Sequence, residues 1–182
     1  MNANMNNDES KLAKETQRMD EATKLIKTPS QENCIKVMRL LEEIEQDGAS
    51  NPSLLKKHKK DVLTLFIMNS EQQCLECYAS KQYSLSRQLY ENLSKFILHY
   101  AEDLDIGRET MMTFITDFMN MVESTGLERI TFGSGNFKKI KVASYNKAVQ
   151  ILENKTLAKV LETLVTCLMM TQVIEECHKN ES

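Results

Sequence analysis

Residues 84–104 read SLSRQLYENLSKFILHYAEDL, and seven apolar side chains in this stretch fall on one face of a helix. Their successive separations are 4, 4, 3, 1, 3 and 4 residues, which follow the 3.6-residue period of an α-helix and not the alternation of a strand. The positions on this face are Leu85, Leu89, Leu93, Phe96, Ile97, Tyr100 and Leu104. The stretch therefore predicts one long amphipathic helix.

Signals for helix ends lie between similar apolar stripes. Thr28 precedes Pro29, and Asn51 precedes Pro52. A capping side chain followed by proline is typical of a helix start, because the first turn does not need the proline N–H. Gly48 follows the next apolar stripe and predicts its end.

The composition extends this pattern to the whole chain. Only 5 glycines and 2 prolines occur among 182 residues, whereas an all-β fold needs many tight turns that use these residues. Further helical stripes lie within about 9–27, 34–44, 54–68, 111–122 and 157–173. We predict an all-α fold, a helical bundle or a short stack of helical hairpins with roughly six to eight helices.

Residues 129–142 depart from the helical period. Ile130 and Phe132 alternate with polar residues, Gly133 and Gly135 suggest a turn, and lysines alternate with apolar residues beyond them. This pattern predicts one small β-hairpin. An ordered loop fits equally well, because an isolated hairpin is only marginally stable.

The predicted domain organisation is simple. Residues 1–8 are polar and rich in asparagine, which predicts a flexible tail. Residues 9–178 predict a single helical domain, with a sub-boundary near 103–107 or near 126–143 as the alternative. Residues 179–182 predict a frayed end.

The sequence also gives an indication of the cellular location of the protein. The N-terminal segment has no basic stretch followed by an apolar one, so no signal peptide is expected. No apolar run of membrane-spanning length is evident either, and we expect no membrane partner. These features predict a cytoplasmic or nuclear protein, in which the 5 cysteines would be reduced thiols.

The sequence contains none of the common hydrolase, zinc-protease or nucleotide-binding motifs. We therefore expect no enzyme activity and no cofactor. Cys74 and Cys77 form a C-x-x-C pair that could hold zinc or cycle redox states, but no second ligand pair with suitable spacing accompanies them. The simpler interpretation is two small side chains on one helical face.

Methionine is the one unusual feature of the composition, with 11 residues. Flexible, polarizable methionine side chains suit surfaces that accept helices of irregular shape. The alternative is ordinary core packing. The candidate partner-binding residues are Met111, Met112, Phe118, Met119 and Met121.

Two basic runs interrupt an acidic chain whose formal charge is −3. They comprise Lys56, Lys57, Lys59 and Lys60, and Lys138, Lys139 and Lys141. Such runs could contact phosphates. The alternative is a solvated helix face, and the net acidity makes nucleic acid the less favoured partner.

These observations favour a non-catalytic module for protein–protein interaction, an adaptor or complex subunit that binds a partner helix or a linear peptide. Self-association through the same apolar surface is a variant of this hypothesis. A nucleic-acid-associated protein that uses the two basic runs is the second hypothesis. An enzyme whose site is assembled from residues far apart in sequence is the third.

Overall fold

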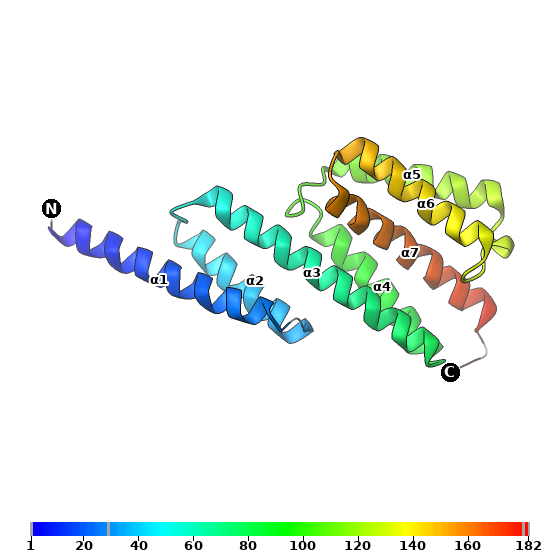
Figure 1. Cartoon of the computed structure of the whole chain (residues 1–182), viewed down its shortest axis with the longest axis horizontal. Coiled ribbons are helices and arrows are strands. Elements are labelled where there is room, and N and C mark those ends of the chain that lie inside the picture. The colour runs from blue at the N-terminus through cyan, green and yellow to red at the C-terminus, as the bar shows by residue number, and fades with distance from the viewer. Residues whose placement is uncertain (1, 29, 180, 182) are drawn as a thin grey trace. The chain divides into compact units, whose positions relative to one another are not determined.

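The computed structural model describes residues 2–28, 30–179 and 181, and Figure 1 shows its helices. The prediction of an all-α fold is confirmed: the described residues form seven α-helices and one short 3-10 helix, η1. In chain order these are α1 (Asn2–Ile26), α2 (Gln31–Gln46), α3 (Pro52–Ala79), α4 (Tyr83–His99), α5 (Arg108–Thr125), η1 (Leu127–Arg129), α6 (Gly135–Leu152) and α7 (Lys155–Cys177).

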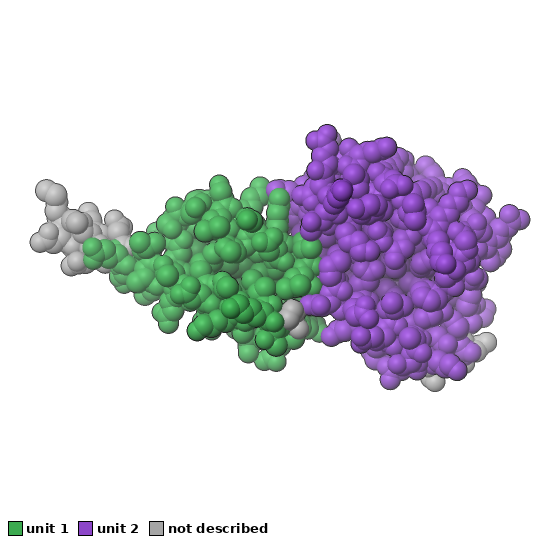
Figure 2. All heavy atoms as spheres, in the orientation of Figure 1, with its two compact units in different colours: residues 1–66 green, residues 67–182 purple. Residues whose placement is uncertain are grey.

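The chain divides into two compact units, residues 1–66 and 67–182, which are coloured separately in Figure 2. The division falls within α3. Both predicted sub-boundaries, 103–107 and 126–143, lie inside the second unit. A single domain over 9–178 stays a prediction.

The first unit is built on the pairing of α1 with α2, joined by the first part of α3. Its core contains Val37, Leu41 and Ile44 of α2, which recur at the spacing of one helical face. Arg18 of α1 forms ion pairs with Glu43 and with Asp47 at the end of α2. The hydrogen bond from Arg18 lowers the pKa of Asp47.

Helices α2 and α3 both begin near their predicted capping residues, but the cap of α2 lies two residues later than predicted. Ser30, not Thr28, caps α2, and its hydroxyl accepts a hydrogen bond from the Asn33 N–H at 3.0 Å. Asn51 accepts from the Leu54 N–H at 3.2 Å, and α3 begins at Pro52 as predicted. Gly48 follows α2 with φ +83°, a conformation that glycine adopts without strain.

Three helix boundaries differ from the predictions. α1 begins at Asn2, so the predicted tail is helical from residue 2 onward; no glycine or proline interrupts its polar start, and a nucleated helix propagates easily. α3 continues through Asn69 and Ser70, past the end of the predicted stripe at 54–68, because neither residue disrupts the backbone. α4 ends at His99, and Leu104 is buried from the turn that follows.

The second unit is organised around α7, which packs against both α4 and α6 (Figure 1). Every residue from Val160 to Cys167 is buried. A helix buried on all sides lies at the centre of a core. The predicted frayed end, 179–182, falls partly outside the described residues.

The predicted β-hairpin at 129–142 is wrong. Residues 127–129 form η1, and α6 begins at Gly135 after the cap Ser134, which accepts a hydrogen bond from the Phe137 N–H at 3.2 Å. Buried positions in α6 recur every three or four residues, and this stripe begins at Phe137 within the segment interpreted as strand. The short alternation before it reflects one buried and one exposed side chain in a loop, Ile130 and Phe132.

The central position of α7 makes its leucines critical for stability. Leu161 is 0% exposed, so Leu161→Ala should lower the free energy of unfolding by about 2–5 kcal/mol through lost burial and a residual cavity. Leu85 of α4 is 46% exposed, and Leu85→Ala is the matched control, with an expected loss below about 0.5 kcal/mol. Urea denaturation followed by circular dichroism measures both. Equal losses would contradict a central α7.

Candidate functional site

The methionine-rich helix α5 separates the candidate partner-binding residues into two groups. Met111 and Phe118 are buried and belong to the core. Met112 and Met119 are 60% and 47% exposed, respectively. Met121 is partly exposed. Met111 and Phe118 therefore serve in core packing, which was the alternative interpretation of the methionine-rich helix. Met112 and Met119 remain available on its outer face.

Met112 and Met119 are separated by seven residues and so lie on the same face of α5, two turns apart. Ile115, which is partly exposed, lies between them near the same face. We call Met112, Ile115 and Met119 the α5 stripe. The side chains of the α5 stripe are apolar, and those of the two methionines are also flexible. The stripe lies on the outer surface of α5, whose opposite face is packed in the core.

The first basic run lies on α3 within the first unit. Lys56 and Lys57 are exposed, and Lys60 is partly exposed. Lys59 forms an ion pair with Glu45 of α2, and its side chain is only 11% exposed. This lysine therefore joins two helices and is not part of a solvated basic surface.

The second basic run lies on α6 within the second unit. Lys138 and Lys139 are exposed in the first turns of the helix, where the macrodipole adds positive potential. Lys141 points elsewhere and forms an ion pair with Glu162 of α7 at 3.4 Å. Lys59 of the first run and Lys141 of the second thus each form an ion pair within the chain.

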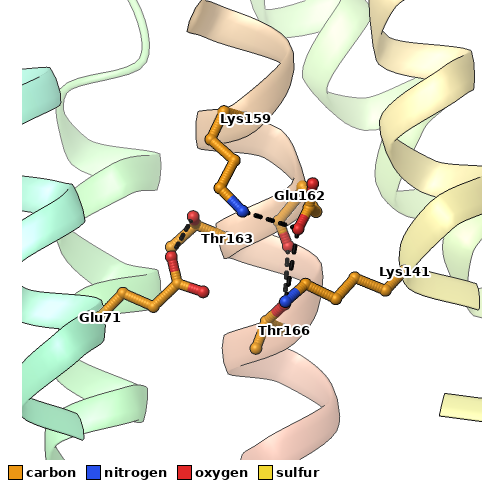
Figure 3. A network of polar contacts seen from close by, with 6 residues as sticks. All are labelled: Glu71, Lys141, Lys159, Glu162, Thr163 and Thr166. Atoms are coloured by element: carbon orange, nitrogen blue, oxygen red, sulfur yellow. Dashed lines mark hydrogen bonds and ion pairs between the residues drawn. The ribbon is translucent and has the colours of Figure 1, made fainter. Parts of the chain in front are cut away.

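Glu162 is the centre of a polar network on α7, shown in Figure 3. Its nearly buried carboxylate contacts Lys159 at 2.9 Å as well as Lys141. Burial alone would lower the pKa of Lys159, but its hydrogen bond to Glu162 and the nearby negative charge more than offset that effect and raise it. Two lysines thereby compensate one buried carboxylate.

The same network also joins α3 to α7. The Thr163 hydroxyl donates a hydrogen bond to Glu71 of α3 at 2.6 Å, and the Thr166 hydroxyl donates to the main-chain carbonyl of Glu162 at 3.0 Å (Figure 3). Glu162, Thr163 and Thr166 are buried, whereas Glu71, Lys141 and Lys159 are partly exposed. The network therefore links α3 and α6 to α7.

The two cysteines of the C-x-x-C pair lie in different surroundings. Cys74 is buried, and burial raises the pKa of its thiol to about 12. Cys77 is partly exposed. Within the described ranges, no three histidine, cysteine or acidic side chains come together as a metal site would require. Cys74 therefore behaves as a small core side chain.

An aromatic cluster that local sequence patterns do not reveal lies at one end of α7. The His178 ring stacks on Tyr83, with ring centroids 3.8 Å apart and an angle of 7° between the planes. Tyr78 lies beside both rings, and its hydroxyl is 3.1 Å from His178 Nε2. Phe132 contacts Tyr78. The aromatic cluster thus brings together residues from α3, from α4, from the loop before α6 and from the end of α7.

Glu181 contacts the Nδ1 atom of His178, which completes a carboxylate–histidine–hydroxyl series. Such a series activates a nucleophile when the hydroxyl loses its proton readily. Burial raises the pKa of Tyr78, and the neighbouring Tyr83 adds to that effect. The raised pKa disfavours loss of that proton. The contacts of Tyr78 with His178, Tyr83 and Phe132 join the ends of α3 and α7 to the start of α4 and to the loop before α6.

Comparison with protein-family models, curated proteins and solved structures found no match.

Within the described residues, α7 has the length and hydropathy that a membrane crossing needs. However, 78% of its most apolar window is buried inside the protein. The core helix of a soluble protein has the same properties, so these features do not by themselves indicate a membrane span.

Removal of the Glu162 charge should destabilise the chain. Glu162→Gln leaves Lys141 and Lys159 without their shared carboxylate, and we expect a loss of about 1–2 kcal/mol in the free energy of unfolding, since both lysines retain some contact with water. Glu91→Gln breaks the more exposed pair with Lys95 and serves as the control, with an expected effect below about 0.5 kcal/mol. Equal losses in urea denaturation would refute a special role for Glu162.

The rate at which each cysteine reacts with a thiol reagent should follow the exposure of its side chain. Cys177 is exposed and should react first with a thiol-specific reagent such as dithionitrobenzoate. Cys74 and Cys167 should react only when the chain unfolds, because burial raises the pKa of both thiols. Cys177→Ser should remove the fast phase of the time course. A fast phase that persists in this variant would contradict the assignment.

Proposed function

We propose that the protein is a non-catalytic module for protein–protein interaction, an adaptor or complex subunit in the cytoplasm or nucleus. The observation that carries the proposal is the α5 stripe. Met112 and Met119 remain largely exposed on a helix whose other face is packed into the core. Exposed apolar side chains that gather on one helix face are typical of binding surfaces.

The partner that suits the α5 stripe is a helix or linear peptide with an apolar face. Such a segment would lie along α5 and place its own apolar residues against Met112 and Met119. Methionine side chains adapt to the shape of a partner through three rotatable bonds, so the stripe tolerates an irregular partner. Pairing of the stripe with the same stripe on a second copy is a variant with the same chemistry.

Substitution of the stripe should abolish binding without unfolding the chain. In affinity purification from the protein's own cells, the variant Met112→Lys/Met119→Lys should lose a stoichiometric protein partner that the unaltered chain retains. Leu98→Lys is the matched control, because Leu98 is an exposed apolar residue of α4. Circular dichroism should show the same helix content in all three chains. Retention of every partner by the double variant would refute the proposal.

Nucleic-acid association is the second candidate, and the exposed Lys138 and Lys139 at the start of α6 favour it. Binding of this kind weakens steeply as salt concentration rises, because counterions are released from the phosphates. Lys138→Gln/Lys139→Gln should then reduce affinity for a nucleic-acid oligomer at low salt. Absence of binding by the unaltered chain at 50 mM salt, measured by fluorescence anisotropy, would exclude this candidate.

A further inference from the structure

A groove of about 350 Å³ lies in the first unit, between α1 and the first turns of α3. Ile44 of α2 and Leu55 of α3 line it and are buried, so they form its base. Leu12 of α1 and Leu54 of α3 also line it, yet they are 52% and 45% exposed. This groove, which we call the α1–α3 groove, therefore has an apolar base and two large apolar side chains that face water at its rim.

The α1–α3 groove follows the axes of the two helices. On α1 its lining includes Leu12, Thr16, Met19 and Thr23, whose spacing marks a single stripe of a helix. The span from Leu12 to Thr23 is about 16 Å at a rise of 1.5 Å per residue. An elongated groove with an apolar base has the form that accepts the apolar face of an amphipathic helix.

The two walls of the α1–α3 groove are attached to each other. The Glu15 carboxylate lines the groove and accepts hydrogen bonds from the Ser50 N–H at 3.0 Å and from the Ser50 hydroxyl at 2.8 Å. Ser50 directly precedes Asn51, the cap of α3, so these bonds attach the start of α3 to α1. The groove is thus preformed, and a partner would bind without the entropic cost of assembling it.

The charged side chains of α1 are sorted between its faces. The hydrogen bond from Arg18, together with the nearby charges of Lys14 and Lys11, lowers the pKa of Asp47 at the end of α2. These three cations of α1 therefore interact with the end of α2. Asp20, in contrast, is exposed and lines the α1–α3 groove.

The outer surface of α1 beside the groove is acidic. Glu9, Asp20 and Glu21 are exposed and line this surface, and Lys24 lies among them. Among the residues that the structure describes, no lysine or arginine lines the α1–α3 groove itself, although His58 does. An excess of carboxylates along one wall favours a partner that carries positive charge at the same place.

We propose that the α1–α3 groove binds an amphipathic helix of a partner protein, one with lysine or arginine along the edge that meets α1. The apolar face of this helix would cover Leu12 and Leu54 and lie over Ile44, and its basic residues would lie beside Asp20 and Glu21. The apolar base determines the shape of the partner, and the acidic wall determines the sign of its charge.

The acidic wall also disfavours the same groove of a second copy as the occupant, because carboxylates of the two chains would then meet. The α1–α3 groove lies in the first unit, whereas the α5 stripe lies in the second. The proposal therefore does not depend on the α5 stripe, and either can fail without the other.

Titration with a designed peptide tests the proposal directly. The ¹⁵N-labelled full chain is titrated at low salt with an amphipathic helical peptide of leucine, alanine and lysine, in which the leucines occupy one face. Amide resonances are followed by NMR. We expect saturable shifts centred on Leu12, Thr16 and Leu54. Absence of saturable shifts, or shifts centred outside the groove, would overturn the proposal.

Two matched peptides separate shape from charge. A peptide of the same composition in scrambled order has no apolar face, and it should give no saturable shifts. A peptide with glutamate in place of lysine keeps the apolar face, and it should bind on the order of tenfold more weakly. Equal binding of the scrambled peptide would reduce the interaction to net charge, and equal binding of the glutamate peptide would remove the basis for a basic partner. Either outcome overturns the proposal.

Variants of the rim then connect binding to the groove. Leu12→Ser/Leu54→Ser should lower affinity for the lysine peptide by about tenfold, because two apolar contacts are lost. Ile35→Ser is the matched control, since Ile35 of α2 is 54% exposed and does not line the groove. Circular dichroism should show the same helix content in all chains. An equal loss of affinity in the control would place the binding elsewhere.

Variants of the acidic wall test the charge without touching an apolar contact. Asp20→Asn/Glu21→Gln should lower affinity for the lysine peptide by about tenfold, or about threefold for each exposed charge. Glu42→Gln removes an exposed carboxylate of α2 that lines neither surface, and it should leave affinity unchanged. Unchanged affinity in the double variant would refute the role of the acidic wall.

Sedimentation of the unaltered chain distinguishes the remaining occupant. We expect the same molecular mass for the unaltered chain and for Leu12→Ser/Leu54→Ser. A dimer that this variant converts to a monomer would assign the α1–α3 groove to a second copy of the chain and overturn the choice of a different partner protein.

Discussion

The all-round burial of α7 from Val160 to Cys167 is the constraint on which the second unit depends. A helix segment with no solvent-facing side must be covered by its neighbours, and α4 and α6 both pack on this helix. Its few polar residues then need partners in the interior. Glu162 satisfies this need through Lys141 and Lys159, and Thr163 through Glu71. The need to bury the apolar side chains of α7 thus determines where its neighbouring helices lie. The polar contacts then favour one alignment of these helices along α7.

The helices around this core are each divided into an inner and an outer half. On α5, which packs on α6, the inner half includes Met111 and Phe118, which become core, and the outer half includes Met112 and Met119, which remain exposed. On α6 the same division directs Lys141 toward Glu162, whereas Lys138 and Lys139 stay exposed. Residues adjacent in sequence therefore have different roles, because successive helical positions are rotated by about 100°.

The ends of helices, more than their sides, carry the features that combine distant parts of the chain. The aromatic cluster brings His178 to Tyr78 and Tyr83, about 100 residues away along the chain. A groove beside η1 also borders the last turns of α7. Helix ends have unpaired carbonyl groups and partial charge, so they differ electrically from the packed sides.

The sequence by itself determined the helices, because the 3.6-residue period and capping residues such as Asn51 act over one or two turns. It could also identify which residue types were available for binding. Only the tertiary structure decided which methionines and lysines face solvent and that His178 lies against Tyr78 and Tyr83. The physical reason is the distance along the chain over which each effect acts. Capping and helical periodicity depend on residues within a few positions of one another, whereas burial and ion pairing depend on residues that only folding brings together.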